Sequence, residues 1–560
     1  MGDTLVSIAH FKVSEVHQQL RVKLSQHTIA PMRHQKNSVP GPRAEILARL
    51  GEDAVYDVAV VGGGSTGLGI ALDAAMRGLK VILVESHDFA KGTSSRSTKL
   101  VHGGVRYLGQ GNVSLVREAL HERRTLLQSA PHIAQPLAFV VPAYRWWEKP
   151  FYGVGLKLYD QLAGEAGLGR TELLSSQATL SRIPTARTQG LRGGVLYWDG
   201  QFNDARLAIA IARTAAQYGA LLVNYCRAEA LLYEGGRIAG LSCTDTRSGV
   251  SYRVRSKCVI NATGVWVDAL REKDAQKESV AAFKPLVAPS QGVHLVVDRS
   301  FLQGDTALMV PKTSDGRVLF AVPWLGKVIL GTTDTPRQDL SREPQAFKEE
   351  VDFILGEAGH YLRQAPTRSD VRSIWVGLRP LVKHQDEQDT KTLSREHTVA
   401  ISRTGLVTVT GGKWTTYRVM AEDVLAACQD AKLLAPLPNC STQQARMVGA
   451  PPDQTAVASL SLAPGPHSYG AEQALVQSLP GADQWISPGL SEAMVRFALR
   501  YEYALTVEDV LARRSRLLFL DAQQAAAAAS KVAALITQEL GQDGDAAGFL
   551  EICTHFSLVP

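Results

Sequence analysis

Apolar residues near the start of the chain gather in short continuous runs instead of alternating with polar ones. The run from Val58 to Val61 is typical of a strand that is buried on both faces of a parallel sheet. A glycine turn, a helix that Gly78 can end, and a second apolar run at 81–84 follow. The pattern predicts a strand, a helix and a second strand in succession.

Three glycines occupy the turn after the first strand in a G-x-G-x-x-G pattern. Gly62 permits a tight turn, Gly64 lets the backbone approach a pyrophosphate, and Gly67 allows the helix to pack closely on the strand. The helix N-terminus then offers unpaired N–H groups and a positive dipole end to that anion. Glu85 ends the second strand at the spacing of an acid that binds ribose hydroxyls. Together these features predict a dinucleotide-binding unit.

Two later segments return to the same predicted sheet. Residues 258–264 and 406–412 each form an apolar strand that ends in a turn of small residues. Such strands bring distant parts of the chain to the sheet edge where open α/β sheets bind ligands. The segment 413–418 (KWTTYR) is expected to begin a helix beside the cofactor, with N–H groups that stabilise negative charge on a reduced flavin. These returns favour FAD over a nicotinamide cofactor.

The character of the chain changes near residue 433. Strand and helix patterns alternate before it, whereas 433–468 is rich in proline and glycine and marks a boundary. Residues 469–560 favour a small helical domain, with a capping signal at 506–509 and an alanine-rich helix at 525–535. Its apolar positions fall near helical spacing: Val507, Val510, Leu511, Leu517 and Leu518.

Two charged or amphipathic stretches have an open role. Arg513, Arg514 and Arg516 are by default a solvated helix face, and a partner-binding surface is the alternative. Residues 1–54 precede the first strand as an extension; a transit peptide is the alternative, and the acids at Asp3 and Glu15 argue against it. Its first part has a partly helical apolar face: Leu5, Ile8, Phe11, Val16 and Leu20.

Composition describes an ordinary globular protein that is long enough for more than one domain. The 560 residues are 45% hydrophobic and 20% charged, with a net charge of +6 and no basic block of the kind that binds nucleic acid. The basic residues instead suit an anionic substrate. Six cysteines are scattered without C-x-x-C spacing, which favours a reducing compartment, and no cysteine–histidine pattern predicts a metal site.

Membrane contact is expected at the surface of a bilayer, if anywhere. The chain has no stretch of about 20 continuous apolar residues that could span one. Residues 145–159 (RWWEKPFYGVGLKLY) mix aromatic and apolar residues with lysines, as interfacial segments do. Core packing of this segment is the competing interpretation.

Several motifs together resemble one family, the FAD-dependent glycerol-3-phosphate dehydrogenases. The resemblance covers roughly residues 56–430, and TVEDVLARRSRL at 506–517 resembles the family's C-terminal helical domain. The motifs are GGGSTGLGIALDAAMRG from Gly62, TSSRSTKLVHGGVRYL at 93–108, PW at 323–324, GTTD at 331–334, GLRPL at 377–381 and GGKWTTYR at 411–418. The combination of KLVHGGVRYL with GGKWTTYR is specific to this family, whereas the glycine motif is shared by many flavoproteins.

The resemblance implies an α/β fold with a doubly wound FAD-binding domain of the glutathione-reductase and D-amino-acid-oxidase type. A mixed-sheet substrate domain would interrupt it within 55–432, and 433–468 would link it to the C-terminal helical domain at 469–560. The implied reaction is oxidation of sn-glycerol 3-phosphate to dihydroxyacetone phosphate, with a hydride passing from C2 to flavin N5 and electrons passing to a quinone.

Hydroxyls and small residues are expected to hold FAD, with turn formation and helix capping as the alternative role. In this family context His102, in its HGG turn, suits a loop that supports the cofactor. The expected cofactor-binding residues are Gly62, Gly64, Ser65, Thr66, Gly67, Glu85, Thr93, Ser94, Ser95, Lys99, His102, Gly264, Gly412, Lys413, Trp414 and Thr415.

A phosphorylated polyol requires cations, and the planar fork of arginine suits a phosphate. The motif context favours Arg106 and Arg379, and less directly Arg395 and Lys413, while each alone could be a surface or structural ion-pair residue. Tyr107 is expected to bond the substrate or to pack.

His294, in PSQGVHLVV, is the leading candidate for the general base. Its intrinsic pKa suits proton transfer, and it resembles the histidine on the family's substrate-facing strand. A hydrogen-bonded structural histidine is the competing interpretation. Arg379 is expected to stabilise the developing alkoxide or ketone oxygen if it faces the flavin.

Two other functions remain open from the sequence. An oxygen-using glycerol-3-phosphate oxidase or an amine or amino-acid oxidase could use the same fold, and a non-catalytic flavin-binding assembly module belongs to another class. Oligomeric state is also open, with a homodimer as a candidate. The expected location is the cytoplasmic face of the inner membrane for a bacterial protein, or the cytoplasm otherwise.

Overall fold

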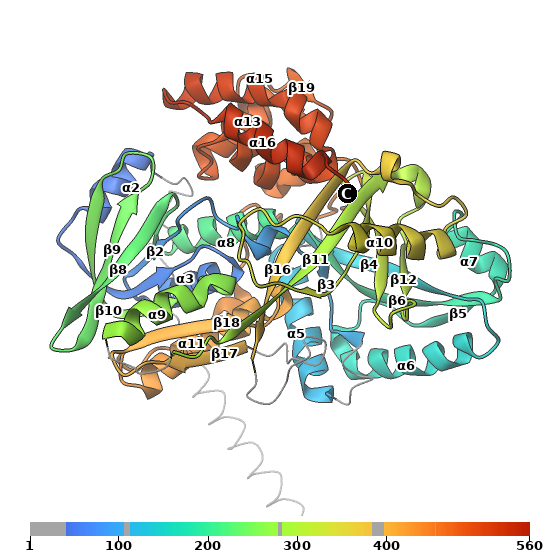
Figure 1. Cartoon of the computed structure of the whole chain (residues 1–560), viewed down its shortest axis with the longest axis horizontal. Helices are drawn as coiled ribbons and strands as arrows, with labels where there is room; N and C mark the ends of the chain where they lie inside the picture. Colours follow the sequence, from blue (N-terminus) through green and yellow to red (C-terminus); the bar gives the residue numbers. More distant parts are fainter. Residues whose placement is uncertain (1–40, 106–111, 278–282, 384–396, 454) are drawn as a thin grey trace, which may run out of the picture. The chain divides into compact units, whose positions relative to one another are not determined.

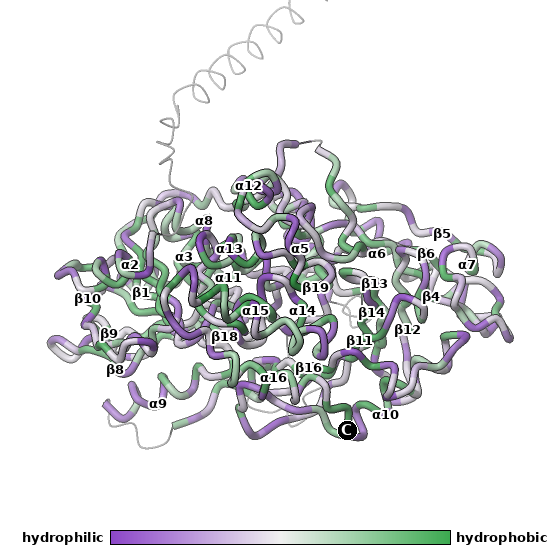
Figure 2. Tube along the Cα trace, turned by 90° about the horizontal axis from the view of Figure 1, so that it is seen from above, coloured by the Kyte–Doolittle hydropathy of each residue, from purple (hydrophilic) through white to green (hydrophobic). Residues whose placement is uncertain are grey.

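The computed structural model describes residues 41–105, 112–277, 283–383, 397–453 and 455–560. Within them two sheets lie beside each other and a group of helices at the C-terminal end packs near both (Figure 1). Figure 2 shows green, apolar stretches gathered around β13 and β14, whereas α9 is mostly purple and hydrophilic.

The first sheet is the predicted dinucleotide-binding one. Its strand order is β17-β18-β10-β1-β2-β7, and all neighbouring strands are parallel except β17, with β8 and β9 attached to β10 as antiparallel additions. The strands are β1 (Val55–Val61), β2 (Val81–Val84), β7 (Leu221–Val223), β8 (Cys226–Glu234), β9 (Arg237–Asp245), β10 (Ser251–Asn261), β17 (His397–Ile401) and β18 (Leu406–Gly411).

Both faces of β1 are buried, as its continuous apolar run predicts. Val58 and Val60 belong to one core cluster, which includes residues of the helices α3 (Ser65–Met76), α8 (Asp204–Gln217) and α11 (Tyr417–Asp430). Ala59 and Val61 belong to a second cluster, with β8, β9 and Leu50. The strand therefore carries apolar residues at consecutive positions because it has no solvent-facing side.

Two short helices complete this part. α9 (Val267–Lys277) follows β10, and α2 (Arg43–Leu50) packs near β7. Arg43 anchors α2 through an ion pair with Asp245 at 2.5 Å. The end of the predicted N-terminal extension is thus packed on the dinucleotide-binding region; the predicted apolar face at residues 5–20 lies outside the described residues.

The second sheet is mixed, as expected for a substrate domain. Its order is β15-β11-β14-β13-β12-β4-β6-β3, with β16 on β11 and β5 on β6. The strands are β3 (Leu100–Val101), β4 (Ala134–Ala143), β5 (Glu172–Leu174), β6 (Gly193–Phe202), β11 (Val287–Asp298), β12 (Ala307–Val310), β13 (Leu319–Trp324), β14 (Lys327–Gly331), β15 (Thr335–Pro336) and β16 (Ser373–Val382). Its helices are α5 (Val113–Ser129), α6 (Glu148–Ala163), α7 (Ser176–Arg182) and α10 (Lys348–Tyr361).

The C-terminal part is helical, as predicted. It contains α12 (Gln473–Ser478), α13 (Glu492–Tyr501), a π-helix η9 (Asp509–Arg514), α14 (Leu517–Leu520), α15 (Ala522–Leu540) and α16 (Ala546–Ser557), drawn in orange and red in Figure 1. A short hairpin, β19 (Trp485–Ser487) with β20 (Leu490–Ser491), lies among them.

The default assignment of the arginine group to a solvated face is wrong. Arg513, Arg514 and Arg516 have side chains that are at most 2% exposed. Each carries buried acidic partners, because a buried guanidinium is tolerated only when it is paired. Helical spacing placed the apolar residues correctly but could not reveal these partners.

Residues 145–159 include the start of helix α6 and are partly buried and partly exposed. Neither core packing nor surface exposure describes the whole segment. Leu156 and Tyr159 are buried, whereas Trp146 is 78%, Phe151 65% and Val154 72% exposed. Within the described part of the chain, no helix is long and apolar enough to cross a bilayer.

Candidate functional site

A cavity of about 450 Å³ lies where the carboxyl ends of β1, β10 and β18 meet β11 and β16. Fifteen predicted site residues line it, drawn from five distant parts of the chain. They are Gly62, Gly64, Ser65, Thr66, Glu85, Thr93, Ser94, His102, Gly264, His294, Arg379, Gly412, Lys413, Trp414 and Thr415.

The three glycines of the first turn have the geometry that their pattern predicts. Gly62 has φ +110°, a conformation that side chains rarely adopt. A Cβ on Gly67 would lie 1.9 Å from the carbonyl oxygen of Gly62. The start of α3 can therefore pack this closely on the turn only if residue 67 is glycine. At Gly64 only the Ser94 hydroxyl oxygen, at 3.2 Å, would lie within 4 Å of a Cβ, and Gly64 itself lines the cavity.

Glu85 stands at the end of β2 and its carboxylate is held in place. One oxygen accepts from the Gly63 N–H at 2.7 Å, and the other accepts from the His87 N–H at 2.9 Å and the Ser86 hydroxyl at 3.1 Å. Its carboxylate is therefore fixed beside the glycine turn, as an acid that binds ribose hydroxyls must be.

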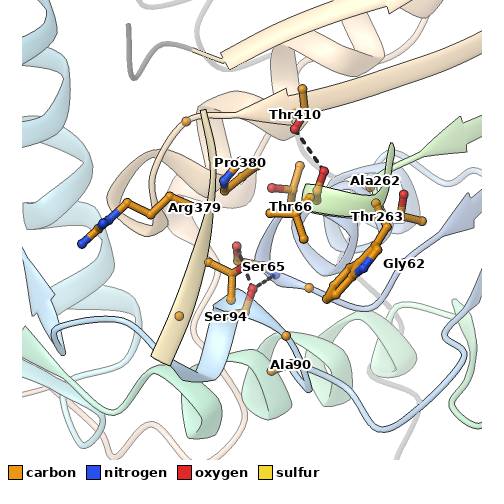
Figure 3. Close-up of a pocket in the computed structure, with 18 of the residues that line it drawn as sticks. Gly62, Ser65, Thr66, Ala90, Ser94, Ala262, Thr263, Arg379, Pro380 and Thr410 are labelled. Carbon is orange, nitrogen blue, oxygen red and sulfur yellow. Dashed lines mark hydrogen bonds between the residues drawn. The ribbon is translucent and has the colours of Figure 1, made fainter. Parts of the chain in front are cut away.

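The loop after β2 connects the cavity walls to one another. The Ser65 N–H at the start of α3 donates to the Ser94 hydroxyl at 2.9 Å, which Figure 3 shows as a dashed line. Trp414 donates from Nε1 to the Ser94 carbonyl at 2.9 Å, and Thr93 donates to the Leu378 carbonyl on β16 at 2.6 Å. These bonds tie the loop to α3, to the turn before α11 and to β16.

The segment after β18 begins a helix, as predicted. A 3₁₀ turn at Trp414–Thr416 leads directly into α11. Gly412 has φ +71°, and a Cβ there would meet the Met420 sulfur at 2.4 Å. The Thr410 hydroxyl donates to the Gly264 carbonyl at 3.2 Å, which joins the two predicted returns of the chain (Figure 3).

His294 lies on β11, lines the same cavity and has Arg379 nearby. Its Nε2 shares a hydrogen bond with the Thr98 hydroxyl at 2.9 Å, and its ring stacks on Trp375 with 5.3 Å between centroids. Its buried Nδ1 has no hydrogen-bond partner among the described residues. Burial, with Lys99 and Arg379 nearby, holds the pKa of His294 well below its usual value of 6.5, so the ring is neutral at neutral pH.

Arg379 lies on β16, paired in register with Ser290 of β11. It donates to the Thr333 carbonyl at 2.8 Å and to Asp334 at 3.2 Å, and in Figure 3 its guanidinium points away from Gly62 and Ser65. A Cβ on Gly292 would come within 2.2 Å of the guanidinium. The arginine is thus fixed at the end of the cavity that also carries His294.

Lys99 is not a lining residue, contrary to the expectation that it meets flavin or phosphate. Its side chain is fully buried and donates to Asp204 and to the Ser95 carbonyl, each at 2.7 Å. Burial lowers its pKa to about 7 although Asp204 opposes the change. The lysine instead lies 5.2 Å from the Trp375 ring centre, behind the tryptophan on which His294 stacks.

Other expected residues also have different positions. Ser95 and Gly67 support the cavity without lining it. Arg106, Tyr107 and Arg395 lie outside the described residues, so their predicted roles stay predictions. Sequence reasoning missed Thr98 and Trp375, since neither belongs to a pattern that distinguishes a histidine partner from an ordinary strand or turn residue.

The residues at one end of the cavity fit FAD. Gly264 leaves open space where a side chain would stand, Glu85 offers fixed acceptors, and the N-terminus of α3 begins directly after Gly64 at the turn. At the other end, the unpartnered Nδ1 of His294 is a buried polar atom that a ligand can satisfy. The cavity therefore has a cofactor end and a reaction end.

Two family models match the chain. The FAD dependent oxidoreductase model matches residues 57–418, and the model of the C-terminal domain of alpha-glycerophosphate oxidase matches residues 440–547. They correspond to the two-sheet region and to the helical region.

Curated relatives and a solved structure agree with these matches. The mitochondrial glycerol-3-phosphate dehydrogenase of Bos taurus is 41% identical over 90% of this chain and 73% of its own length. That of Arabidopsis thaliana is 37% identical over 90% and 86%. The glycerol-3-phosphate dehydrogenase of Bacillus halodurans, solved with FAD, is 30% identical with a TM-score of 0.71 and covers 92% of this chain and 98% of its own. This chain belongs to the family of FAD-dependent glycerol-3-phosphate dehydrogenases.

Proposed function

We propose that the protein oxidises sn-glycerol 3-phosphate to dihydroxyacetone phosphate with FAD and passes the electrons to a quinone. The observation that carries the proposal is a single cavity that joins a glycine-lined cofactor cradle to His294 and Arg379. FAD, when bound, supplies the electron chemistry by accepting a hydride from C2 of the substrate.

His294 accepts the proton of the C2 hydroxyl in this proposal. Its neutral ring has a lone pair, and the Thr98 hydrogen bond and the Trp375 stack fix its orientation. The low pKa that burial imposes weakens the base. A phosphate dianion bound nearby would oppose this effect, because negative charge favours the imidazolium.

Arg379 stabilises the negative charge that develops on the C2 oxygen. Its fork is oriented by Asp334 and by the Thr333 carbonyl, so little reorganisation is needed when charge appears. Lys413 also lines the cavity and is proposed to contact the phosphate or FAD. We keep Arg106, Tyr107 and Arg395 as proposed substrate residues on the resemblance alone.

Anaerobic mixing of the holoenzyme with sn-glycerol 3-phosphate tests the proposal. We expect the visible absorbance of the oxidised flavin to bleach with this substrate and not with amino acids. Bleaching by amino acids alone would favour an amino-acid oxidase, and no bleaching by any polyol phosphate would favour the non-catalytic module. Mixing the reduced enzyme with oxygen or a quinone then identifies the electron acceptor.

We propose that α6 contacts a membrane surface from which quinone is reached. Trp146, Phe151 and Val154 are strongly exposed, and Lys149 and Lys157 on the same segment suit anionic lipid headgroups. The proposed location is the cytoplasmic face of the inner membrane for a bacterial protein, or the cytoplasm otherwise. The curated relatives are described as mitochondrial, so fractionation is the test of compartment.

Vesicles of anionic phospholipid test the membrane contact. The double variant Phe151→Ser and Val154→Ser should bind about tenfold more weakly, because two exposed apolar side chains no longer enter the interface. Trp485→Ser is the matched control, since Trp485 is 52% exposed in the C-terminal part. Equal binding of all three proteins would refute contact through α6.

A further inference from the structure

The loop 88–98 has two sides with different chemistry. Ala90, Lys91, Gly92, Thr93 and Ser94 line the cavity at its cofactor end. The opposite side of the loop faces residues 508–516 of the C-terminal helical part, and the contacts between them are charged and buried.

Asp88, on the loop, is fully enclosed. Its carboxylate is fully buried and accepts from both Arg513 and Arg514, including a bond from Arg514 Nη2 at 2.9 Å. Burial alone would favour the protonated acid, but Arg514 and Arg513 hold the pKa of Asp88 below its usual value. The carboxylate is therefore charged and depends on the two arginines.

Further contacts continue this network along the loop. Lys91 donates to Glu508 at 2.5 Å, and Arg513 donates to the same carboxylate at 2.5 Å. Farther along, Arg516 donates to the Ser95 carbonyl at 2.8 Å. Burial opposes ionisation of Glu508, yet Arg513 and Lys91 hold its pKa far below the usual value.

The contacts of Asp88, Lys91 and Ser95 with the C-terminal part join residues more than 400 positions apart in the chain. A buried charge in such a network is stable only while its partner stays in place. The loop cannot supply the partners itself, because Arg513, Arg514, Arg516 and Glu508 all come from the C-terminal part. The position of the cofactor loop therefore depends partly on that part, beside its bonds to β16 and Trp414 and the ion pairs of Lys91 and Arg96 with Glu343.

We propose that residues 508–516 act as positioning residues for the FAD site, holding the loop 88–98 in its cofactor-binding conformation and thereby slowing FAD release. This proposal rests on the FAD site and does not depend on which substrate reduces the flavin. It gives the C-terminal part a role in retaining the cofactor, although none of the residues 508–516 lines the described cavity.

The test compares the holoenzyme with Glu508→Gln, which removes the charge shared by Lys91 and Arg513. We expect FAD to be released at least about tenfold faster on dilution, measured by the fluorescence of free FAD, a change equivalent to about 1.4 kcal/mol. Amide hydrogen exchange of 88–98 should also rise in the variant while the first strand remains protected. Arg500→Gln is the matched control, because Arg500 pairs with Glu539 in the same helical part and has no bond to the loop.

Release of FAD within twofold of wild type, with unchanged exchange of 88–98, would overturn the proposal even if the melting temperature fell. If Glu508→Gln does not fold, Arg513→Lys provides the same test, since lysine keeps the charge but cannot donate simultaneously to Asp88, Glu508 and Asp509 with the same fork. Faster release of a flavin that sn-glycerol 3-phosphate never reduces would support this inference and refute the proposed function.

Discussion

The two ends of the cavity consist of different groups, backbone at one end and charged side chains at the other. The cofactor end consists mainly of backbone, with Gly62, Gly64 and Gly67 making room and Glu85 supplying fixed acceptors. The reaction end consists of side chains whose charge is set by buried neighbours, above all His294. Sterics therefore govern one end and electrostatics the other, so the two should respond to different kinds of substitution.

Gly67→Ala should remove the cofactor itself, because the new Cβ would lie 1.9 Å from the backbone oxygen of Gly62. We expect FAD content to fall below about one-tenth of wild type, measured by absorbance, as the turn is forced out of its cofactor-binding shape. Gly356→Ala in α10 is the control, since a Cβ at residue 356 would point into open space. Full FAD content in Gly67→Ala would contradict the steric account.

His294→Gln should leave FAD bound but slow the reduction of the flavin by sn-glycerol 3-phosphate. A lost general base typically costs roughly 10²- to 10⁴-fold in rate. Stopped-flow absorbance gives the rate and the FAD content in one sample. A reduction rate within about fivefold of wild type would assign His294 a structural role instead.

Arg379→Met should lower kcat/KM by roughly 10- to 100-fold, the usual value of a charge-assisted hydrogen bond to the substrate. Arg379→Lys should recover only part of the loss, because a single ammonium cannot reproduce the fork. Steady-state kinetics with an artificial acceptor measures both variants. Equal activity of the methionine and lysine variants would show that the charge of Arg379 is not used.

Lys99→Met should have the smallest effect of these substitutions. It tests whether the charge of Lys99 helps to set the pKa of His294. His294 stays neutral until the pH falls well below 6.5, partly because Lys99 is positive. Without that charge the pKa of His294 rises, so the ring is protonated earlier as pH falls and the acid loss of flavin reduction moves to higher pH. Rates measured between pH 5 and 8, approximately the range where histidine titrates, check this; an unchanged profile would exclude Lys99 as a source of the shift.

Two other histidines, His132 and His87, should make the folded protein less stable as the pH falls. Burial and nearby arginines lower the pKa of His132 to about 3, and burial with Arg342 and Lys91 lowers that of His87 to about 4. Both rings are neutral in the folded protein, so their stabilising contribution is present above the unfolded pKa, about 6.5, and is lost as pH falls toward 3–4.

The sequence predicted the cofactor end well because its determinants are local. A continuous apolar run, three glycines and an acid define a turn regardless of what lies elsewhere, and β1, β2, α3 and β10 appear where these patterns predict them. Family resemblance then placed His294 and Arg379 at the same cavity.

The remainder depended on partners that are distant in the sequence. Nothing near Arg514 indicates that Asp88 lies against it, and nothing near Lys99 indicates that Asp204 removes it from the cavity. Exposure of α6 was likewise undecided, because the same mixture of apolar residues and lysines suits an interface or a core. Local sequence patterns cannot predict ion pairs between residues that are distant in the chain.

A crystal structure of the enzyme with FAD and sn-glycerol 3-phosphate tests the central claim most directly. The account predicts the pyrophosphate at Gly64 and Ser65, and the C2 hydroxyl within about 3 Å of a ring nitrogen of His294, with Arg379 at the same oxygen. An isoalloxazine ring bound well away from both side chains would contradict the division of the cavity into a cofactor end and a reaction end.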